Sequence, residues 1–255
     1  MSRRSACLCP MVSRVKQWWQ AAGWNEWAIL AWLTVFSVTV WGFIELADDA
    51  PEGDYLALEN RILRSFRTPE DPGVGIGPHW LPEMARDITA LGSTAVLTLL
   101  VILVLGWLAF RRKFHTALFI FAATVSGTLL SLVLKNAFGR ERPTAVPHLM
   151  IETSLSFPSG HSMLSSVVYF TLGAALASTV KRRIEKIFFV LAAALLSFLT
   201  GVSRLYMGVH YPTDVLAGWA AGTAWALLCG TVAWWLQRHG QLSVPKEPEK
   251  TPPTG

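Results

Sequence analysis

Charged side chains are scarce in this sequence, and their scarcity argues against an ordinary soluble domain. Only 15% of the 255 residues are Asp, Glu, Lys or Arg, whereas 52% are hydrophobic. A soluble globular domain carries about 25% charged residues. A soluble helical core is the competing interpretation, and the length and number of the uncharged stretches disfavour it.

Cysteine and clustered acidic residues are also rare, which excludes further classes of protein. Cys7, Cys9 and Cys229 are too few and too scattered for a disulfide framework or a metal site. The sequence has no cluster of Asp and Glu that could hold magnesium. It also has no basic strip with interleaved aromatic residues outside short loops. We therefore expect no metal, no other cofactor and no nucleic-acid partner.

Long apolar runs, by contrast, recur along the chain. Crossing the hydrocarbon core of a bilayer takes about 20 apolar residues in a helix. Six runs approach or reach this length, and they predict an all-α integral membrane protein built as a bundle of six transmembrane helices. The predicted spans are approximately residues 27–44, 88–110, 116–134, 162–180, 187–203 and 214–236.

These spans define one membrane domain with a segment on either side. We expect a cytoplasmic N-terminal segment over residues 1–26, the membrane domain over 27–236, and a cytoplasmic tail over 237–255. The tail is rich in proline and charge, which is typical of disorder. The first run lacks a small-residue cleavage site, so we expect a retained anchor and not a removed signal peptide.

Lys and Arg are distributed unequally between the two sides of the predicted bundle. The side that carries both termini holds 14 of the 22 basic residues, including those of residues 111–113 and 181–186. The connection over residues 45–87 is acidic, with ten Asp or Glu against four Arg. Because cytoplasmic loops are enriched in Lys and Arg, we expect both termini in the cytoplasm. The protein would then lie in the cytoplasmic (inner) membrane.

The acidic connection contains one amphipathic stretch, "YLALENRILRSFR". It places Leu56, Leu63 and Phe66 on one helical face. This pattern predicts a short helix that lies in the membrane interface. A helix that caps the bundle fits the same pattern, and the sequence leaves both interpretations open.

Three polar clusters occur at the predicted outer ends of the spans, and the first is "KNAFGRERP". It holds Lys135 and Arg142, seven residues apart. Pro143 disfavours helix at the residue before it, so we expect Arg142 at the start of a loop. Basic residues at span ends often lie in the headgroup layer. Here, however, they lie on the side where positive charge is otherwise scarce.

The second cluster is "PSGH", residues 158–161, at the start of the fourth predicted span. A helix N-terminus presents unpaired N–H groups and a partial positive charge, and both favour phosphate binding. We expect donors from the backbone of Ser159, Gly160 and His161. A histidine there can also donate a proton near neutral pH. A helix start with a solvated histidine would give the same tetrapeptide.

The third cluster is "SRLYMGVHYPTD", which joins the last two predicted spans. Arg204 precedes His210 by six residues, and Asp214 follows it by four. Pro212 suits the first turn of a helix, so His210 would lie just before the last helix and Asp214 inside its first turn. We expect His210 to fold back towards the carboxylate.

The predicted topology brings all three clusters to one membrane depth, where charge is costly and is usually retained for a function. The three cations can neutralise a dianionic phosphoryl group. His210 is the expected nucleophile because Asp214 can fix its tautomer. His161 is then the expected general acid, and afterwards the base that activates water.

In order and spacing, the clusters resemble the three-part signature of the type 2 phosphatidic acid phosphatase superfamily. The matching positions are Lys135-x6-Arg142-Pro143, Pro158-Ser159-Gly160-His161 and Ser203-Arg204-x5-His210-x3-Asp214. The resemblance implies a six-helix membrane phosphatase with His161 as acid, His210 as nucleophile and Asp214 as its partner. It also implies that phosphate is bound by Lys135, Arg142, Ser159, Gly160 and Arg204.

The sequence leaves the substrate and the acceptor open. The resemblance implies a lipid phosphate or prenyl diphosphate, such as undecaprenyl diphosphate, phosphatidylglycerophosphate, phosphatidic acid or a lipid A phosphate. A site that faces the periplasm or cell exterior favours the prenyl diphosphate slightly, because it suits carrier recycling. A phosphotransferase that uses another lipid as acceptor would carry the same motifs. A lipid transporter would instead distribute its charges along a pathway.

Overall fold

The computed structural model describes residues 26–152 and 154–238. The segment expected at residues 1–26 and the tail expected at 237–255 therefore lie almost wholly outside the described residues. Over the described ranges the fold is all-helical, with one isolated antiparallel bridge between Arg67 and Gly75. The helices are α2 (Glu26–Glu52), α3 (Leu56–Ser65), α4 (Leu81–Ala90), α5 (Thr94–Phe110), α6 (Phe114–Phe138), α7 (Gly160–Ala177), α8 (Arg183–Tyr206) and α9 (Pro212–Arg238).

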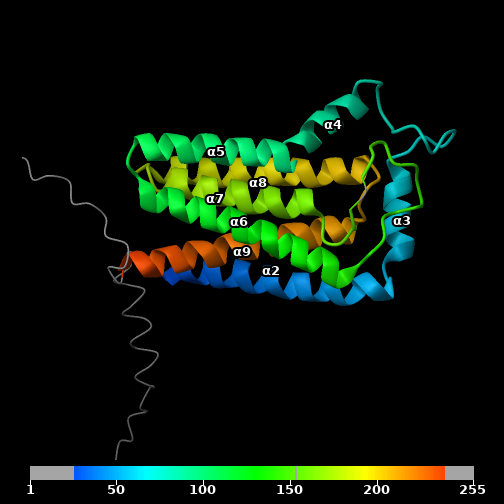
Figure 1. The fold of residues 1–255 in the computed structure, drawn as a ribbon. Helices are drawn as coiled ribbons and strands as arrows, with labels where there is room; N and C mark the ends of the chain where they lie inside the picture. The colour runs from blue at the N-terminus through cyan, green and yellow to red at the C-terminus, as the bar shows by residue number, and fades with distance from the viewer. Residues whose placement is uncertain (1–25, 153, 239–255) are drawn as a thin grey trace, which may run out of the picture.

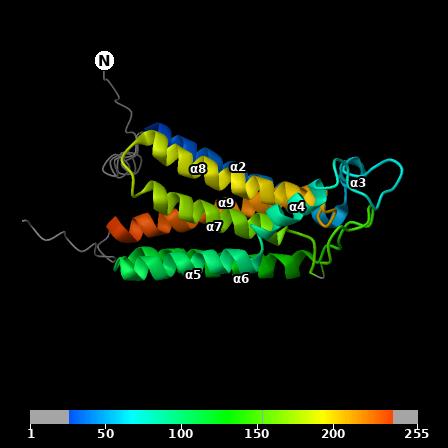
Figure 2. The ribbon, with the colours of Figure 1, turned by 90° about the horizontal axis from the view of Figure 1, so that it is seen from above.

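The long helices run side by side in alternating directions (Figure 1). Seen from above, α7 and α9 lie between a layer of α2 and α8 and a layer of α5 and α6 (Figure 2). One end of the bundle gathers the starts of α5, α7 and α9 with the ends of α2, α6 and α8, and α3 and α4 lie at that same end (Figure 1). The three polar clusters therefore meet at one end, as the topology predicted.

Each predicted span coincides with a helix, but the second is not straight. The chain bends by 46° between α4 and α5, so the start predicted at residue 88 falls inside the separate helix α4. Ser93 breaks the helix, because it is extended and its side chain caps α5 by accepting a hydrogen bond from the Val96 amide. The apolar run over residues 88–110 predicted one continuous helix and did not predict this bend.

Length and hydropathy identify fewer membrane-crossing helices than the six predicted. Within the described residues, α2, α6, α8 and α9 are long and apolar enough, and α4 with α5 adds a fifth if the bent pair is one span. Helix α7 is not among them. It has 18 residues and nine of them are buried, including several serines. Its place is the centre of the bundle, where it packs against α5, α6, α8 and α9.

Helix α3 packs across the end of the bundle through a buried face that includes Glu59 and Leu63 (Figure 1). Leu63 is fully buried, whereas Leu56 is 41% exposed, so the predicted apolar face is only partly directed into the protein. A charged residue, Glu59, shares the buried face. This contact with the bundle agrees with a capping helix.

Helices α7 and α9 approach each other closely because α9 carries two glycines one turn apart. A Cβ atom at Gly218 would meet the Ser159 carbonyl oxygen at 2.7 Å, and one at Gly222 would meet the Met163 carbonyl oxygen at 2.5 Å. Pairs of small residues at this spacing let membrane helices pack backbone to backbone. The contact fixes the first turn of α7 against the first turns of α9.

We expect Gly218→Ala to lower the thermal unfolding midpoint in detergent, because its methyl group meets backbone that cannot rotate away. Overpacking of this kind costs about 1–3 kcal/mol. Gly230→Ala on the same helix is the matched control, since nothing lies within 4 Å of a Cβ atom there. Tryptophan fluorescence measures both midpoints, and equal midpoints would contradict the close-packing account.

Candidate active site

The first cluster is delivered by the end of α6 and the loop that follows. Lys135 lies in the last turn of α6, which ends at Phe138 and is capped by Gly139 in the left-handed conformation (φ 61°). Glycine adopts this conformation without steric strain. Arg142 lies in the following loop, as the proline after it predicted.

The second cluster forms the start of α7. Ser159 is the N-cap of α7 and its side chain accepts a hydrogen bond from the Ser162 amide. The Ser159 amide donates to the Asp214 carbonyl oxygen at 2.9 Å. The expectation that this amide is available to phosphate therefore does not fit the structure. Gly160 and His161 follow in the first turn, where helix geometry supplies no acceptor for the N–H groups.

The third cluster forms a buried histidine–carboxylate pair at the start of α9. That helix begins at Pro212, and Nδ1 of His210 lies 3.4 Å from Oδ2 of Asp214. His210 is 1% exposed and Asp214 is fully buried. The Tyr211 amide donates to the same Oδ2 at 2.8 Å. The predicted folding back of His210 towards Asp214 is present.

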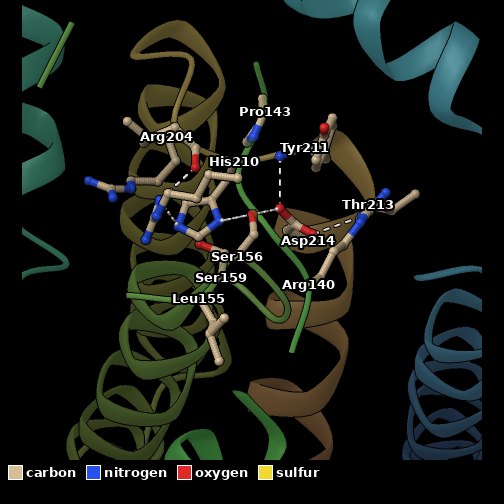
Figure 3. A network of polar contacts seen from close by, with 12 residues as sticks. Arg140, Pro143, Leu155, Ser156, Ser159, Arg204, His210, Tyr211, Thr213 and Asp214 are labelled. Atoms are coloured by element: carbon tan, nitrogen blue, oxygen red, sulfur yellow. Dashed lines mark hydrogen bonds and ion pairs between the residues drawn. The ribbon is translucent and has the colours of Figure 1, made fainter. Parts of the chain in front are cut away.

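Ser156 joins this pair from the loop before α7. Its hydroxyl donates to Asp214 Oδ2, and its oxygen lies 3.4 Å from His210 Nδ1. Figure 3 shows Ser156 beside His210 and Asp214, with Arg140 and Thr213 on the other side of the carboxylate. Sequence reasoning missed Ser156, because a serine two residues before the second cluster carries no signal of its own.

The opposite nitrogen of His210 faces a cation. Nη1 of Arg142 lies 3.4 Å from His210 Nε2 and donates to the Val209 carbonyl oxygen at 2.6 Å. Burial lowers the pKa of His210 well below its ordinary value, and the nearby Arg204 and Arg142 lower it further. The imidazole is therefore neutral at neutral pH, which is the form that can act as a nucleophile.

The three cations lie within electrostatic range of His210 and contact one loop. Lys135 Nζ donates to the Ser154 hydroxyl at 3.0 Å and to the Leu155 carbonyl oxygen at 2.9 Å. Arg142 Nε donates to the Ser154 carbonyl oxygen at 2.7 Å. Arg204 is fully buried, and His161 lies within electrostatic range of all three. The predicted convergence of cations and histidines is thus present in the geometry.

Glu152 contacts two of these cations and was not predicted. Its carboxylate binds Arg204 and lies 3.6 Å from Nη2 of Arg142. Burial alone would raise the pKa of Glu152, but Arg204 and then Arg142 outweigh it, so the net pKa is lowered. The ionised carboxylate offsets part of the positive charge that an anionic ligand would meet. A single acidic residue between two motifs does not by itself predict that it will pair with these cations.

A second unpredicted group lies behind Asp214. Arg140 donates to Asp214 Oδ1 at 2.8 Å and to Glu59 Oε2 at 2.7 Å. The signature skips Arg140, although it lies only two residues before Arg142.

Within residues 26–152 and 154–238, no group of three or more His, Cys, Asp or Glu side chains is placed to hold a metal ion.

Known proteins share both the sequence pattern and the fold. A family model described as PAP2 superfamily matches residues 116–238. Phosphatidylglycerophosphatase B of Bacillus subtilis is 36% identical over 145 residues, which cover 56% of this chain and 70% of that protein. Undecaprenyl-diphosphatase of Sulfolobus acidocaldarius is 31% identical over 149 residues, which cover 56% of this chain and 63% of that protein.

A solved structure shows that the likeness includes the fold. The crystal structure of a transmembrane PAP2 type phosphatidylglycerolphosphate phosphatase from Bacillus subtilis matches with a TM-score of 0.72 and 29% identity. The match covers 80% of this chain and 98% of that one. Fold and site therefore define a membrane phosphatase. The chain belongs to the PAP2 superfamily, which confirms the resemblance seen in the sequence.

Proposed function

We propose that this protein hydrolyses a lipid phosphate or prenyl diphosphate through a phosphohistidine intermediate on His210. One observation carries the proposal. The buried His210 faces Asp214 with Nδ1, and its Nε2 lies 3.4 Å from Nη1 of Arg142. We infer that Nε2 points to where a phosphoryl group would be held. Phosphoryl transfer needs mainly charge stabilisation and placement in line. The cations near His210 support the proposal because they can supply the charge stabilisation.

Binding would use the three cations and the first turn of α7. Arg142 and Arg204 each offer a planar fork of donors to phosphate oxygens, and Lys135 adds a point charge. The Gly160 and His161 amides add donors at the helix N-terminus. The Glu152 carboxylate competes for two of the same cations, so the bound phosphoryl group displaces part of its contacts. Ser159 would contribute to phosphate binding indirectly, as the N-cap that fixes the first turn of α7.

In the first step, His210 Nε2 attacks phosphorus and the bond from phosphorus to the leaving oxygen breaks. His161 gives a proton to that oxygen, while Asp214 stabilises the positive charge that develops on the imidazole ring. In the second step, His161 takes a proton from water, and the water oxygen attacks the phosphohistidine. Inorganic phosphate leaves and His210 is restored. The side-chain cations supply the charge stabilisation that metals provide in other phosphoryl-transfer enzymes.

We further propose six membrane spans, with α7 as one and the bent pair α4–α5 as another. The active-site end lies opposite the connections that carry residues 111–113 and 181–186 (Figure 1). Because basic connections favour the cytoplasm, the site would face the periplasm or cell exterior and both termini would lie inside. The phosphatase domain would then comprise residues 27–236.

The substrate candidates come from the relatives' names. One relative is named phosphatidylglycerophosphatase B and another undecaprenyl-diphosphatase. These names support a panel of phosphatidylglycerophosphate, undecaprenyl diphosphate and phosphatidic acid as substrates for this chain. Transfer of the phosphoryl group to a second lipid would use the same first step and differ only in the acceptor.

The first test is release of inorganic phosphate from this panel by the purified protein in detergent, with EDTA present. We expect release to survive chelation, and His210→Ala to abolish it on every substrate because His210 is the proposed nucleophile. The fastest substrate ranks the candidates. Substantial activity in the variant would rule out His210 as the nucleophile, and no release by the wild type would point to transfer or transport.

A second test separates the roles of the two histidines. His161→Ala should slow hydrolysis of phosphate monoesters more than hydrolysis of diphosphates, because a leaving alkoxide needs a proton far more than a leaving phosphate does. The comparison is the ratio of kcat between variant and wild type for phosphatidic acid and for undecaprenyl diphosphate. Equal losses would mean that His161 acts mainly in the hydrolytic second step.

A further inference from the structure

A buried row of alternating charge extends from the catalytic carboxylate to helix α3. Asp214, Arg140 and Glu59 follow one another in this row, and their side chains are 0%, 9% and 2% exposed. Glu59 lies outside the three clusters, and Arg140 lies within the first cluster but is not one of its signature positions. Neither contacts the cations that would hold phosphate. Arg140 instead contacts Asp214 from the side opposite His210 (Figure 3). Glu59 in turn contacts Arg140.

The two oxygens of Asp214 have different partners. Oδ2 accepts hydrogen bonds from Ser156 and from the Tyr211 amide, and it is the oxygen that faces His210. Oδ1 accepts from Arg140 at 2.8 Å. A carboxylate with both oxygens engaged from fixed directions cannot rotate about its terminal torsion. The contact from Arg140 therefore keeps Oδ2 directed at the imidazole.

Arg140 is itself held in place on several sides. Its second nitrogen bonds to Glu59 at 2.7 Å, and its guanidinium lies 4.3 Å from the centre of the Tyr211 ring. Burial lowers the pKa of Arg140, but Asp214 and Glu59 outweigh this and raise it, so the side chain stays charged. A planar fork can bind two carboxylates at once, which a lysine ammonium cannot do with the same geometry.

Glu59 ties this arrangement to the backbone of α9. Its Oε1 accepts from the Thr213 amide at 3.2 Å and from the Thr213 hydroxyl. Thr213 also accepts from Arg140 at 2.7 Å. A carboxylate at a helix N-terminus is favoured by the unpaired amides and the helix dipole. Glu59 therefore fixes Arg140 against the same first turn that carries Asp214.

We propose that Arg140 and Glu59 are positioning residues for the reaction: Glu59 on α3 orients Arg140, and Arg140 orients Asp214 towards His210. This inference rests on the proposed function. It gives α3 a part in catalysis through one buried glutamate, without any contact between α3 and the phosphoryl group. Removing either residue should affect the chemical step and leave substrate binding nearly intact.

The test compares two conservative variants, Arg140→Lys and Glu59→Gln, with wild type on the fastest lipid phosphate of the panel. We expect kcat to fall by about 10- to 100-fold, because small misplacement of a catalytic group has effects of this size. KM should stay within about twofold, since neither side chain touches the phosphate. Arg64→Lys on the exposed side of α3 and Glu70→Gln in the following loop are matched controls and should change neither constant.

A double-mutant cycle with Asp214→Asn shows whether the effect passes through Asp214. Once Asp214 is replaced, Arg140→Lys should slow single-turnover hydrolysis by less than about twofold, because there is no carboxylate left to position. Size-exclusion elution and the thermal midpoint establish that each variant is folded. Arg140→Ala is avoided, because it would remove the cation that pairs with two buried carboxylates.

Three results would overturn the inference. The first is an unchanged kcat in folded Arg140→Lys. The second is a rise in KM that accounts for most of the loss in kcat/KM. The third is an equal fall in the single-turnover rate when Arg140→Lys is made in the Asp214→Asn background. In each case active wild type and inactive His210→Ala would leave the proposed function intact. A wild-type protein that releases no phosphate from any lipid would overturn the proposed function, and this inference with it.

Discussion

The burial of the Asp214 carboxylate is the constraint on which the rest of the site depends. A charged group without water needs partners, and removing one partner from a buried pair costs about 3–5 kcal/mol. Its side chain bonds to the 139–143 loop, to the loop before α7 and to the backbone before α9. Its carbonyl oxygen accepts from Ser159 at the start of α7. Satisfying one carboxylate thus brings together the segments that carry the nucleophile, the helix terminus and the cations.

The membrane fold explains why this polar assembly occurs at one end of the bundle. Helices bury their backbone groups along the apolar length, so unpaired amides and charged side chains gather where helices begin and end. The close contact of α7 with Gly218 and Gly222 of α9 holds two of these ends together. Positive charge from three separate segments then surrounds a neutral, buried His210, while Glu152 balances part of it.

The sequence predicted the parts of this structure that depend on local pattern. Apolar runs located the long helices, Pro212 located the start of α9, and the spacing of His210 and Asp214 predicted their contact. It did not predict contacts between distant segments. Arg140 and Glu59 are 81 residues apart, and their pairing depends on how α3 packs across the bundle. The bend before α5 and the engagement of the Ser159 amide likewise follow from tertiary packing.

The most direct test of the account is to trap the covalent intermediate. Wild-type protein would be mixed with a lipid phosphate labelled in its phosphoryl group, quenched in alkali within one turnover, digested, and analysed by mass spectrometry. The account predicts an alkali-stable phosphoryl group on Nε2 of His210. This group should form more slowly in the Asp214→Asn variant and should be absent in His210→Ala. Label on another residue, or turnover without any protein-bound phosphate at times when product accumulates, would contradict it.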